Sequence, residues 1–400
     1  MEAAGVVASL SRARGGEQLL EAAADRPGLW LVGGAVRDLL LGIEPIELDV
    51  LVEGDMEALA RELGEPTFHE RFGTATVRGD RFTIDLAEPR AESYPAPGSL
   101  PEVGPATVEE DLRRRDFTIN AIAVSLPGGE VACDPRAFDD LREGTLRVLH
   151  DGSFADDPTR VWRMARYAGR LGFSPDARTA ELAAQATPGE ASGERIGNEL
   201  RLVLGEEDPC AALEALARYC PQVLPPGFSP RPEGLDDALE LLPGDGRRDL
   251  LVLAACTAGM DVESLARWLD ELAFTAGDRD LVLASSRWVT GAPLRTAEGP
   301  VAVARAARGA PLEAVALAGG ANARLWLDEL RHVELEIDGD DLVAAGMEPG
   351  PQLGEALQRA LDAKLAGRCE GREAELAAAL DAGSKDALAA CRTVSSRRWP

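Results

Sequence analysis

The hydrophobic pattern of this 400-residue chain changes character near residue 157. Before that point, short apolar or alternating runs lie between glycine, proline and charged residues, and Leu29–Val32, Ile46–Val52 and Thr74–Leu86 have the pattern of strands. After it, leucine and alanine recur at helical spacing, interrupted by Pro/Gly-rich stretches at Pro221–Gly234 and Gly291–Pro311. The pattern predicts an α+β N-terminal domain, with a small mixed sheet and flanking helices, followed by an all-α region.

Length and cysteine usage set further bounds. A chain of 400 residues exceeds what one hydrophobic core usually organises, so at least two packed units are expected. No stretch approaches the ~18 uncharged apolar residues of a membrane span, and the N-terminus has no signal-peptide pattern. We therefore expect a cytoplasmic protein with no membrane association. The cysteines are widely spaced without a Cys-x-x-Cys, which favours buried thiols over a zinc site or disulfide framework; they are Cys133, Cys210, Cys220, Cys256, Cys369 and Cys391.

The net charge argues against a nucleic-acid partner. A formal charge of −27 should repel a polyanion. The basic residues are almost all arginine, however, and they cluster at residues 113–115 and along residues 160–170, where they could bind phosphate locally. The charge alone leaves open both a plain acidic surface and a local basic site.

A predicted strand ends in paired glycines and leads directly into a predicted helix, in the segment Leu31–Gly42. The pair Gly33-Gly34 would let backbone N–H groups approach a triphosphate at the helix N-terminus. Ordinary strand-to-helix turns also need glycine, so this segment is informative only together with its neighbours.

Two carboxylates follow on an alternating segment. Glu47 and Asp49 are two residues apart, so on a strand they project from the same face and could bind one pair of cations. A two-metal site for phosphoryl transfer needs a further carboxylate from a neighbouring strand. Asp85 is the best candidate, with Glu88 as the alternative. In a chain with 69 acidic residues, such a pair could equally be an exposed strand surface.

Two arginine-containing segments come next. In the first, residues 109–123, Arg115, Asp116 and Asn120 could bind phosphate oxygens and ribose hydroxyls beside the metals. In the second, residues 156–167, Pro158 suits a first helical turn and Asp157 suits its cap. Arg160, Arg163 and Arg166 then recur every three residues along one helix face.

Together these segments resemble the class II tRNA nucleotidyltransferase and bacterial poly(A) polymerase family. Five motifs occur in the family's order, and residues 193–200 and 339–354 resemble its neck and tail. The resemblance implies a nucleotidyltransferase catalytic head at 1–150, a helical nucleotide-selecting neck at 151–210, and a helical RNA-binding body and tail at 211–400.

The resemblance also implies residue roles. Glu47, Asp49 and Asp85 would be the catalytic carboxylates that hold two Mg²⁺ ions. Asp157 and Arg160 would form a protein edge that pairs with cytosine or adenine. The implied nucleotide-binding set is Gly33, Gly34, Arg37, Arg115, Asp116, Asn120, Asp157, Arg160, Arg163 and Arg166. Glu47 departs from the family, which normally has aspartate there, so a shifted but active site is expected and a weakened one stays open.

The implied reaction is addition of C and/or A from CTP and ATP to a tRNA 3′ end, with release of pyrophosphate. Enzymes that add only A, only CC, or poly(A) share these motifs, so the specificity stays open. The segment Pro89–Thr107 resembles the mobile loop of relatives that add the terminal A, which disfavours a strict CC-adder. A catalytically weak RNA-binding relative and a small-molecule nucleotidyltransferase are the rival classes. The oligomeric state is not predicted.

Overall fold

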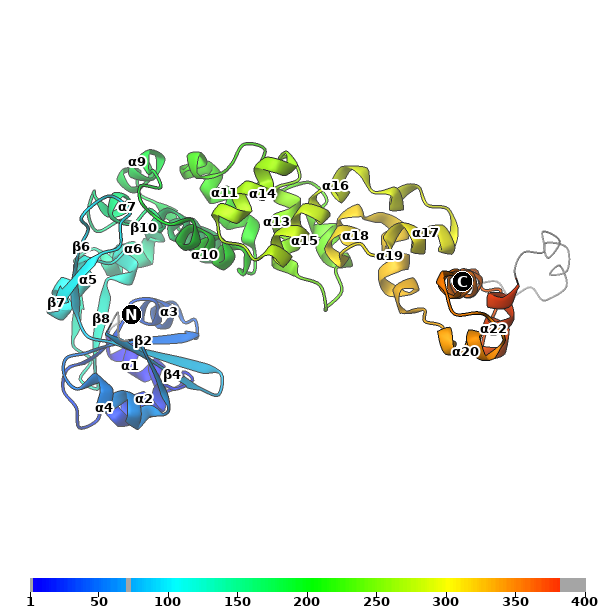
Figure 1. Cartoon of the computed structure of the whole chain (residues 1–400). Coiled ribbons are helices and arrows are strands. Elements are labelled where there is room, and N and C mark those ends of the chain that lie inside the picture. The colour runs from blue at the N-terminus through cyan, green and yellow to red at the C-terminus, as the bar shows by residue number, and fades with distance from the viewer. Residues whose placement is uncertain (1–2, 70–72, 382–400) are drawn as a thin grey trace. The chain divides into compact units, whose positions relative to one another are not determined.

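The computed structural model describes residues 3–69 and 73–381. The chain forms two compact units (Figure 1): residues 1–231 with 267–274 make up unit 1, and residues 232–266 with 275–400 make up unit 2. Unit 1 carries all the sheets found in the described part, and unit 2 is helical there. The predicted α+β fold followed by a helical region is therefore confirmed.

Unit 1 is built on a seven-stranded sheet. Its strands are β1 (Leu29–Val32), β2 (Glu47–Val52), β3 (Pro66–His69), β4 (Thr74–Gly79), β5 (Phe82–Ala87), β8 (Ile122–Leu126) and β9 (Val131–Cys133). Their order is β3-β4-β5-β2-β1-β8-β9. Only β2 and β5 pair in parallel, and the other neighbours are antiparallel. The strands predicted within residues 29–32, 46–52 and 74–86 are thus confirmed.

Helices cover the sheet of unit 1. They are α1 (Ala3–Leu10), α2 (Gly16–Ala23), α3 (Gly34–Leu41), α4 (Met56–Leu63), α5 (Val108–Arg113) and α6 (Ala137–Glu143). α3 packs on β1, β2 and β8, and α4 packs on β3, β4 and β5. α5 begins with a capping box in which the Thr107 side chain accepts from the Glu110 N–H while Glu110 accepts from the Thr107 N–H.

Alternation along β2 decides which side chains face α5. Leu48, Val50 and Val52 are buried on one face, so Glu47, Asp49 and Leu51 belong to the other. Leu51 packs in a buried cluster with Val108 and Leu112 of α5. The two carboxylates therefore share the face of the sheet that α5 covers.

The segment expected to be a mobile loop contains a second, two-stranded sheet. β6 (Arg90–Ser93) pairs with β7 (Glu102–Pro105), with Glu92 opposite Val103. The residues between these strands are also held: Gly98 donates its N–H to the Ala155 carbonyl, and Glu190 donates to the Pro97 carbonyl. The prediction of a loop was wrong here because backbone pairing and contacts from distant segments fix residues that look irregular in sequence.

The rest of unit 1 is mainly helical. It contains η1 (Thr118–Asn120), β10 (Thr145–Leu146), α7 (Ser153–Asp156), α8 (Arg160–Leu171), β11 (Ser174–Pro175), α9 (Ala177–Gln185), α10 (Gly193–Leu204), α11 (Pro209–Tyr219) and η2 (Pro221–Val223). α8 and α11 pack closely, because a Cβ at Gly169 would lie 2.6 Å from the Ala212 nitrogen. The short strand β11, which pairs in parallel with β10, is an exception to the all-α prediction after residue 157.

Unit 2 consists of packed helices. They are α12 (Leu235–Leu241), α13 (Arg248–Cys256), α15 (Ala276–Ser286), α16 (Trp288–Gly291), η3 (Pro293–Thr296), α17 (Gly299–Ala307), α18 (Leu312–Ala318), α19 (Gly320–Asp328), η4 (Leu330–His332), α20 (Gly339–Ala344), α21 (Pro351–Leu365) and α22 (Arg372–Leu380), while α14 (Val262–Glu271) has residues in both units. α13 is buried on every side from Leu250 to Cys256. The predicted interruption at 291–311 was partly wrong, because α17 begins there with a proline in its first turn, where no N–H is needed.

The burial of the cysteines agrees only in part with the sequence prediction. Cys210, Cys220 and Cys256 are buried free thiols, but Cys133 and Cys369 are only half-buried, so the prediction of buried thiols was wrong for these two. Cys391 lies outside the described residues. Among the helices described, none is both long and apolar enough to cross a membrane.

Candidate active site

The glycine pair forms a tight turn between β1 and α3. Gly33 has a φ of +67°, which favours glycine, and its N–H donates to the Ile122 carbonyl at 3.1 Å. A Cβ at Gly33 would lie 2.7 Å from the Arg115 guanidinium and 3.6 Å from Asp49 Oδ2. Because Gly33 has no side chain, the backbone of the turn can lie close to both Arg115 and Asp49.

The carboxylates predicted as metal ligands lie on two adjacent strands. In the parallel β2–β5 pair Asp49 is directly opposite Asp85, and Leu51 is opposite Ala87. Glu47 is exposed, Asp49 is half-buried, and neither accepts a hydrogen bond from the described residues. Asp85 Oδ1 accepts a 2.6 Å bond from the Thr76 hydroxyl. The structure thus brings the three acids to one sheet face but leaves only two without a partner.

The donor set fits a hard divalent cation in part. Within residues 3–69 and 73–381, no three His, Cys, Asp or Glu side chains stand close enough to hold a metal ion as they lie. Mg²⁺, however, is commonly held by one or two carboxylates together with substrate phosphates. Glu47 and Asp49 supply such a pair beside the glycine turn. Glu88, the alternative third ligand, is exposed beyond the end of β5.

Electrostatics distinguish Asp49 from its neighbours. Burial raises the pKa of Asp49 to about 6, Arg115 opposes the increase, and Asp85 and Glu47 add to it. An ionised Asp49 is therefore unfavourable without a nearby positive charge. A cation bound at this edge would remove that penalty.

A chain of polar contacts runs behind the glycine turn. Arg37 is 3% exposed and donates to Asp38 and, at 2.7 Å, to Asn120 Oδ1. Asn120 donates to Asp116 Oδ1 at 2.9 Å, and Asp116 Oδ2 accepts from Arg163 at 2.9 Å. Burial opposes ionisation of Asp116, but Arg163 and Asn120 outweigh it and lower its pKa to about 2. These four predicted nucleotide-binding residues therefore hold one another in place.

Tyr167 lies among three of the arginines. Its ring centroid is 4.9 Å from the Arg37 guanidinium carbon, 5.8 Å from that of Arg163 and 5.2 Å from that of Arg166. Its hydroxyl accepts from Arg163 at 3.1 Å, and Arg166 makes an ion pair with Glu206 at 3.4 Å. The buried ring fixes the spacing of these cations.

The start of α8 differs from the prediction. The helix begins at Arg160, not at Pro158. Asp157 Oδ1 accepts hydrogen bonds from both the N–H and the hydroxyl of Thr159, and the first backbone hydrogen bonds form a tighter turn than that of an α-helix. Arg195 also donates to Asp157 Oδ1 at 2.9 Å. Arg160 donates to the Ser153 hydroxyl and the Arg114 carbonyl, both at 2.7 Å. Asp157 and Arg160 thus make no ion pair with each other.

One cavity of about 860 Å³ in unit 1 joins these features. The glycine turn and the β2 carboxylates line one part of it, and residues of α8 and α10 line another. Of the predicted site residues, Asp85 does not line it, whereas the others do: Gly33, Gly34, Arg37, Glu47, Asp49, Arg115, Asp116, Asn120, Asp157, Arg160, Arg163 and Arg166. The structure therefore assembles almost the whole predicted set around one space.

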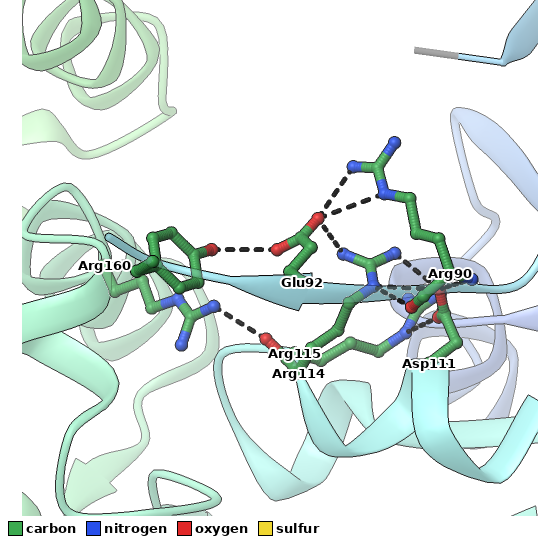
Figure 2. Close-up of polar contacts among 7 residues, drawn as sticks. Arg90, Glu92, Asp111, Arg114, Arg115 and Arg160 are labelled. Carbon is green, nitrogen blue, oxygen red and sulfur yellow. Dashed lines mark hydrogen bonds and ion pairs between the residues drawn. The ribbon is translucent and has the colours of Figure 1, made fainter. Parts of the chain in front are cut away.

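Several lining or supporting residues were missed by the sequence analysis. Glu92 and Tyr94 reach the cavity from the β6–β7 hairpin, and Arg195 reaches it from α10. Figure 2 shows Glu92 joined to two arginines beside the buried Asp111. Asp111 could have been found from its spacing of three and four residues before Arg114 and Arg115, which follow directly after α5. No sequence pattern connects Glu92 to this site.

Comparisons with known proteins agree with this arrangement. Residues 29–147 match the family described as poly A polymerase head domain. An A-adding tRNA nucleotidyltransferase of Halalkalibacterium halodurans is 39% identical over 206 residues, 48% of each chain. A CC-adding tRNA nucleotidyltransferase of Deinococcus radiodurans is 42% identical over 220 residues, 52% of this chain and 58% of that protein. The chain is thus similar to tRNA nucleotidyltransferases and, over residues 29–147, to the head domain of poly(A) polymerases. The match spans about half the length of these two relatives.

Solved structures of the family resemble more of the chain. The apo form II of a CCA-adding enzyme has a TM-score of 0.74 and 28% identity, and the alignment covers 90% of this chain and 93% of that one. A Thermotoga maritima CCA-adding enzyme, solved in complex with tRNA, has a TM-score of 0.72 and 25% identity, with coverage of 95% and 98%. The likeness to family members therefore extends through both units.

Proposed function

We propose that this protein is a template-independent RNA nucleotidyltransferase that adds C and/or A to the 3′ end of tRNA. The observation that carries the proposal is the single cavity shared by the glycine turn, an unpartnered pair of carboxylates, and the Asp157 and Arg160 side chains. In the proposed reaction the RNA 3′-hydroxyl attacks the α-phosphorus of CTP or ATP and pyrophosphate leaves. Relatives named A-adding tRNA nucleotidyltransferase, CC-adding tRNA nucleotidyltransferase and multifunctional CCA protein match 48%, 52% and 47% of this chain.

The triphosphate half of the cavity is proposed to be the glycine turn with Arg115. The open backbone at Gly33 and Gly34, at the N-terminus of α3, suits phosphate oxygens. Arg115 lies over Gly33 and supplies positive charge there. Arg37 is committed to Asp38 and Asn120, so we assign it a positioning role behind the turn. Asp116, held by Asn120 and Arg163, is assigned to the ribose.

Glu47, Asp49 and Asp85 are proposed to hold two Mg²⁺ ions. When bound, such ions activate the attacking hydroxyl and neutralise the triphosphate and leaving pyrophosphate. Glu47 and Asp49 can act as ligands as they lie. Asp85 retains Oδ2 as a possible donor atom while Thr76 holds its Oδ1. The longer glutamate at position 47 reaches from an exposed position at the start of β2.

Base selection is proposed to reside in Asp157 and Arg160. A carboxylate accepts from an exocyclic amine, and a guanidinium donates to ring nitrogens or carbonyls. The bonds of Arg160 to Ser153 and to the Arg114 carbonyl leave further N–H groups of its guanidinium for a base. Arg163 and Arg166 are proposed to brace this pair and to contact phosphates.

The remaining assignments follow the family. We propose that residues 1–150 are the catalytic head, 151–210 the nucleotide-selecting neck, and 211–400 the RNA-binding body and tail of a cytoplasmic enzyme. Binding of tRNA through arginines of the C-terminal half would weaken steeply with salt, despite the acidic total charge. The resemblance of Pro89–Thr107 to the loop of relatives that add the terminal A is our ground for proposing addition of A over a strict CC activity.

The test is incubation of the full chain with Mg²⁺, labelled CTP or ATP, and tRNA that lacks its 3′ end or ends in CC. Incorporation into either RNA supports the proposal, and the pattern of C and A shows which specificity applies. Binding of tRNA without incorporation would identify a non-catalytic relative. Nucleotide transfer to a small molecule, with none to RNA, would identify the other rival class.

A further inference from the structure

Asp111 of α5 is a fully buried carboxylate whose two oxygens hold two different arginines. Oδ1 accepts from Arg114 Nε at 2.9 Å and Nη2 at 2.6 Å, whereas Oδ2 accepts from Arg115 Nε at 3.1 Å and Nη2 at 2.9 Å. The Arg90 N–H adds a 3.2 Å bond to Oδ1. Asp111 is 0% exposed and does not line the cavity. It therefore acts on the site only through the arginines that it holds.

The arm that starts from Oδ2 leads to the glycine turn. Arg115 is held by both Nε and Nη2, which leaves Nη1 against Gly33, where an added Cβ would lie 2.7 Å from it. The same guanidinium acts against the rise in the pKa of Asp49. This arm reaches the part of the cavity assigned to the triphosphate.

The arm that starts from Oδ1 leads to the hairpin and to α8. Arg114 Nη1 donates to Glu92 at 2.8 Å, and Glu92, in turn, accepts from the Tyr94 hydroxyl at 2.8 Å. The backbone carbonyl of Arg114 accepts from Arg160 Nη2 at 2.7 Å. Figure 2 shows this arm from Asp111 through Arg114 to Arg160, with Glu92 beside it. It ends at the residue assigned to base selection.

We infer that Asp111 is a positioning residue that fixes the triphosphate-binding and base-selecting halves of the site at once. The inference rests on the proposed function. Burial alone would raise the pKa of Asp111, but Arg115 and Arg114 outweigh it and lower the pKa, so the carboxylate stays ionised between them. Two forked guanidinium groups on one carboxylate restrict both arginines to one geometry.

Asp111→Asn tests the inference because asparagine has nearly the same side-chain shape as aspartate but only one acceptor oxygen in place of two. The amide has an oxygen for one arginine, but its NH₂ group faces N–H donors of the other. Two quantities report on the two arms: the dissociation constant of tripolyphosphate with Mg²⁺, measured by calorimetry, and the ratio of kcat/KM for CTP or ATP to that for UTP. We expect the variant to weaken tripolyphosphate binding and to lower the base preference, each by about tenfold.

Single-arm variants should separate the two effects. Arg115→Ala should weaken tripolyphosphate binding and leave the base preference unchanged, whereas Glu92→Gln should lower the base preference and leave tripolyphosphate binding unchanged. These variants do not alter the buried carboxylate, so they keep the test available if Asp111→Asn does not fold. Equal effects of both variants on both quantities would overturn the division into two arms.

Asp140→Asn is the matched control. Asp140 is 2% exposed, accepts from Arg147 through two nitrogens and from the Thr118 hydroxyl, and does not line the cavity. The Asp140→Asn substitution should lower the melting temperature and leave tripolyphosphate binding and the base preference as in the parent. The inference is overturned if Asp111→Asn folds and changes neither quantity, or only one. Failure of the parent chain to incorporate any nucleotide would instead overturn the proposed function.

Discussion

Two groups of carboxylates lie at the same cavity in unit 1, and they differ in their neighbours. Glu47 and Asp49 on β2 have no hydrogen-bond partner among the described residues. Asp38 and Asp116, by contrast, are held by arginines within 2.9 Å, and Asp111 behind the wall is held by two. The first group is available to a ligand, while the second is part of the scaffold.

The pKa values of Asp49 and Asp116 move in opposite directions. Burial raises the pKa of Asp49 to about 6, whereas Arg163 and Asn120 overcome burial and lower that of Asp116 to about 2. Asp49 therefore destabilises the fold when ionised, and Asp116 stabilises it. An acid kept ionised at a cost to stability, on the wall of a cavity, indicates a functional rather than a structural role.

The largest expected effect comes from Asp49→Asn. Loss of this cation ligand should reduce incorporation of CTP and ATP by about a thousandfold or more, while tRNA affinity stays close to that of the parent. Because the folded pKa of Asp49 lies above its ordinary value, removing the charge should not lower the melting temperature at neutral pH. Retained Mg²⁺-dependent turnover, measured by label incorporation, would refute the assignment of Asp49.

Arg160→Ala tests a cavity arginine whose hydrogen-bond partners, the Ser153 hydroxyl and the Arg114 carbonyl, are uncharged. We expect slower use of CTP and ATP and a relaxed rejection of UTP and GTP by about 10- to 100-fold, with Mg²⁺ dependence retained. The measurement is kcat/KM for the four nucleotides. Arg178→Ala on α9, which removes an exposed arginine paired with Asp151, is the control. Unchanged ratios in Arg160→Ala would show that this side chain does not select the base.

Asp116→Asn should have the opposite effect on stability to Asp49→Asn. A folded pKa of about 2 against an ordinary value near 4 corresponds to roughly 2 kcal/mol of unfolding free energy at neutral pH. This contribution is present above pH ~4 and is lost as the pH falls toward the folded pKa, reaching about half near pH 3. Urea unfolding of parent and variant at several pH values checks it. A difference that is independent of pH would mean that Asp116 is not held as an ion.

Glu47→Asp should have the smallest effect. Aspartate is the usual residue here in the family that the sequence resembles. It moves the proposed ligand closer to β2, so the Mg²⁺ concentration for half-maximal incorporation should change only a few-fold. Loss of all activity would show that this site has adapted to glutamate. The result shows how far an unpartnered carboxylate can move and still bind a cation, which the arginine-held carboxylates are not expected to do.

The sequence predicted the elements of the site better than their contacts. The strand ending in Gly33-Gly34 and the pair Glu47 and Asp49 follow from local periodicity, and the structure has them. Asp85 was chosen as a carboxylate from a neighbouring strand, and the structure places it opposite Asp49. The predicted start of α8 was wrong by two residues because Thr159 bonds to Asp157 and the first backbone bonds form a tighter turn. The ordered hairpin depends on contacts from residues 155 and 190, which no local pattern reveals.

Sequence spacing indicates which acids are held by arginine only for Asp111. Asp111 and Asp116 lie in one arginine-rich segment, whereas Asp49 lies in an apolar strand without arginine. Asp111 is held by arginines three and four residues away, but Arg163 of α8 reaches Asp116 across 47 residues of sequence, and no arginine makes an ion pair with Asp49 among the described residues. Only the three-dimensional arrangement separates ligand from scaffold.

The most direct test of this separation is Mn²⁺ binding in the presence of CTP, followed by the electron paramagnetic resonance signal of the free ion. The account predicts that the parent chain and Asp116→Asn take up Mn²⁺, because Asp116 already has its cation in Arg163, and that Asp49→Asn does not. Uptake by Asp49→Asn equal to that of the parent would contradict the account.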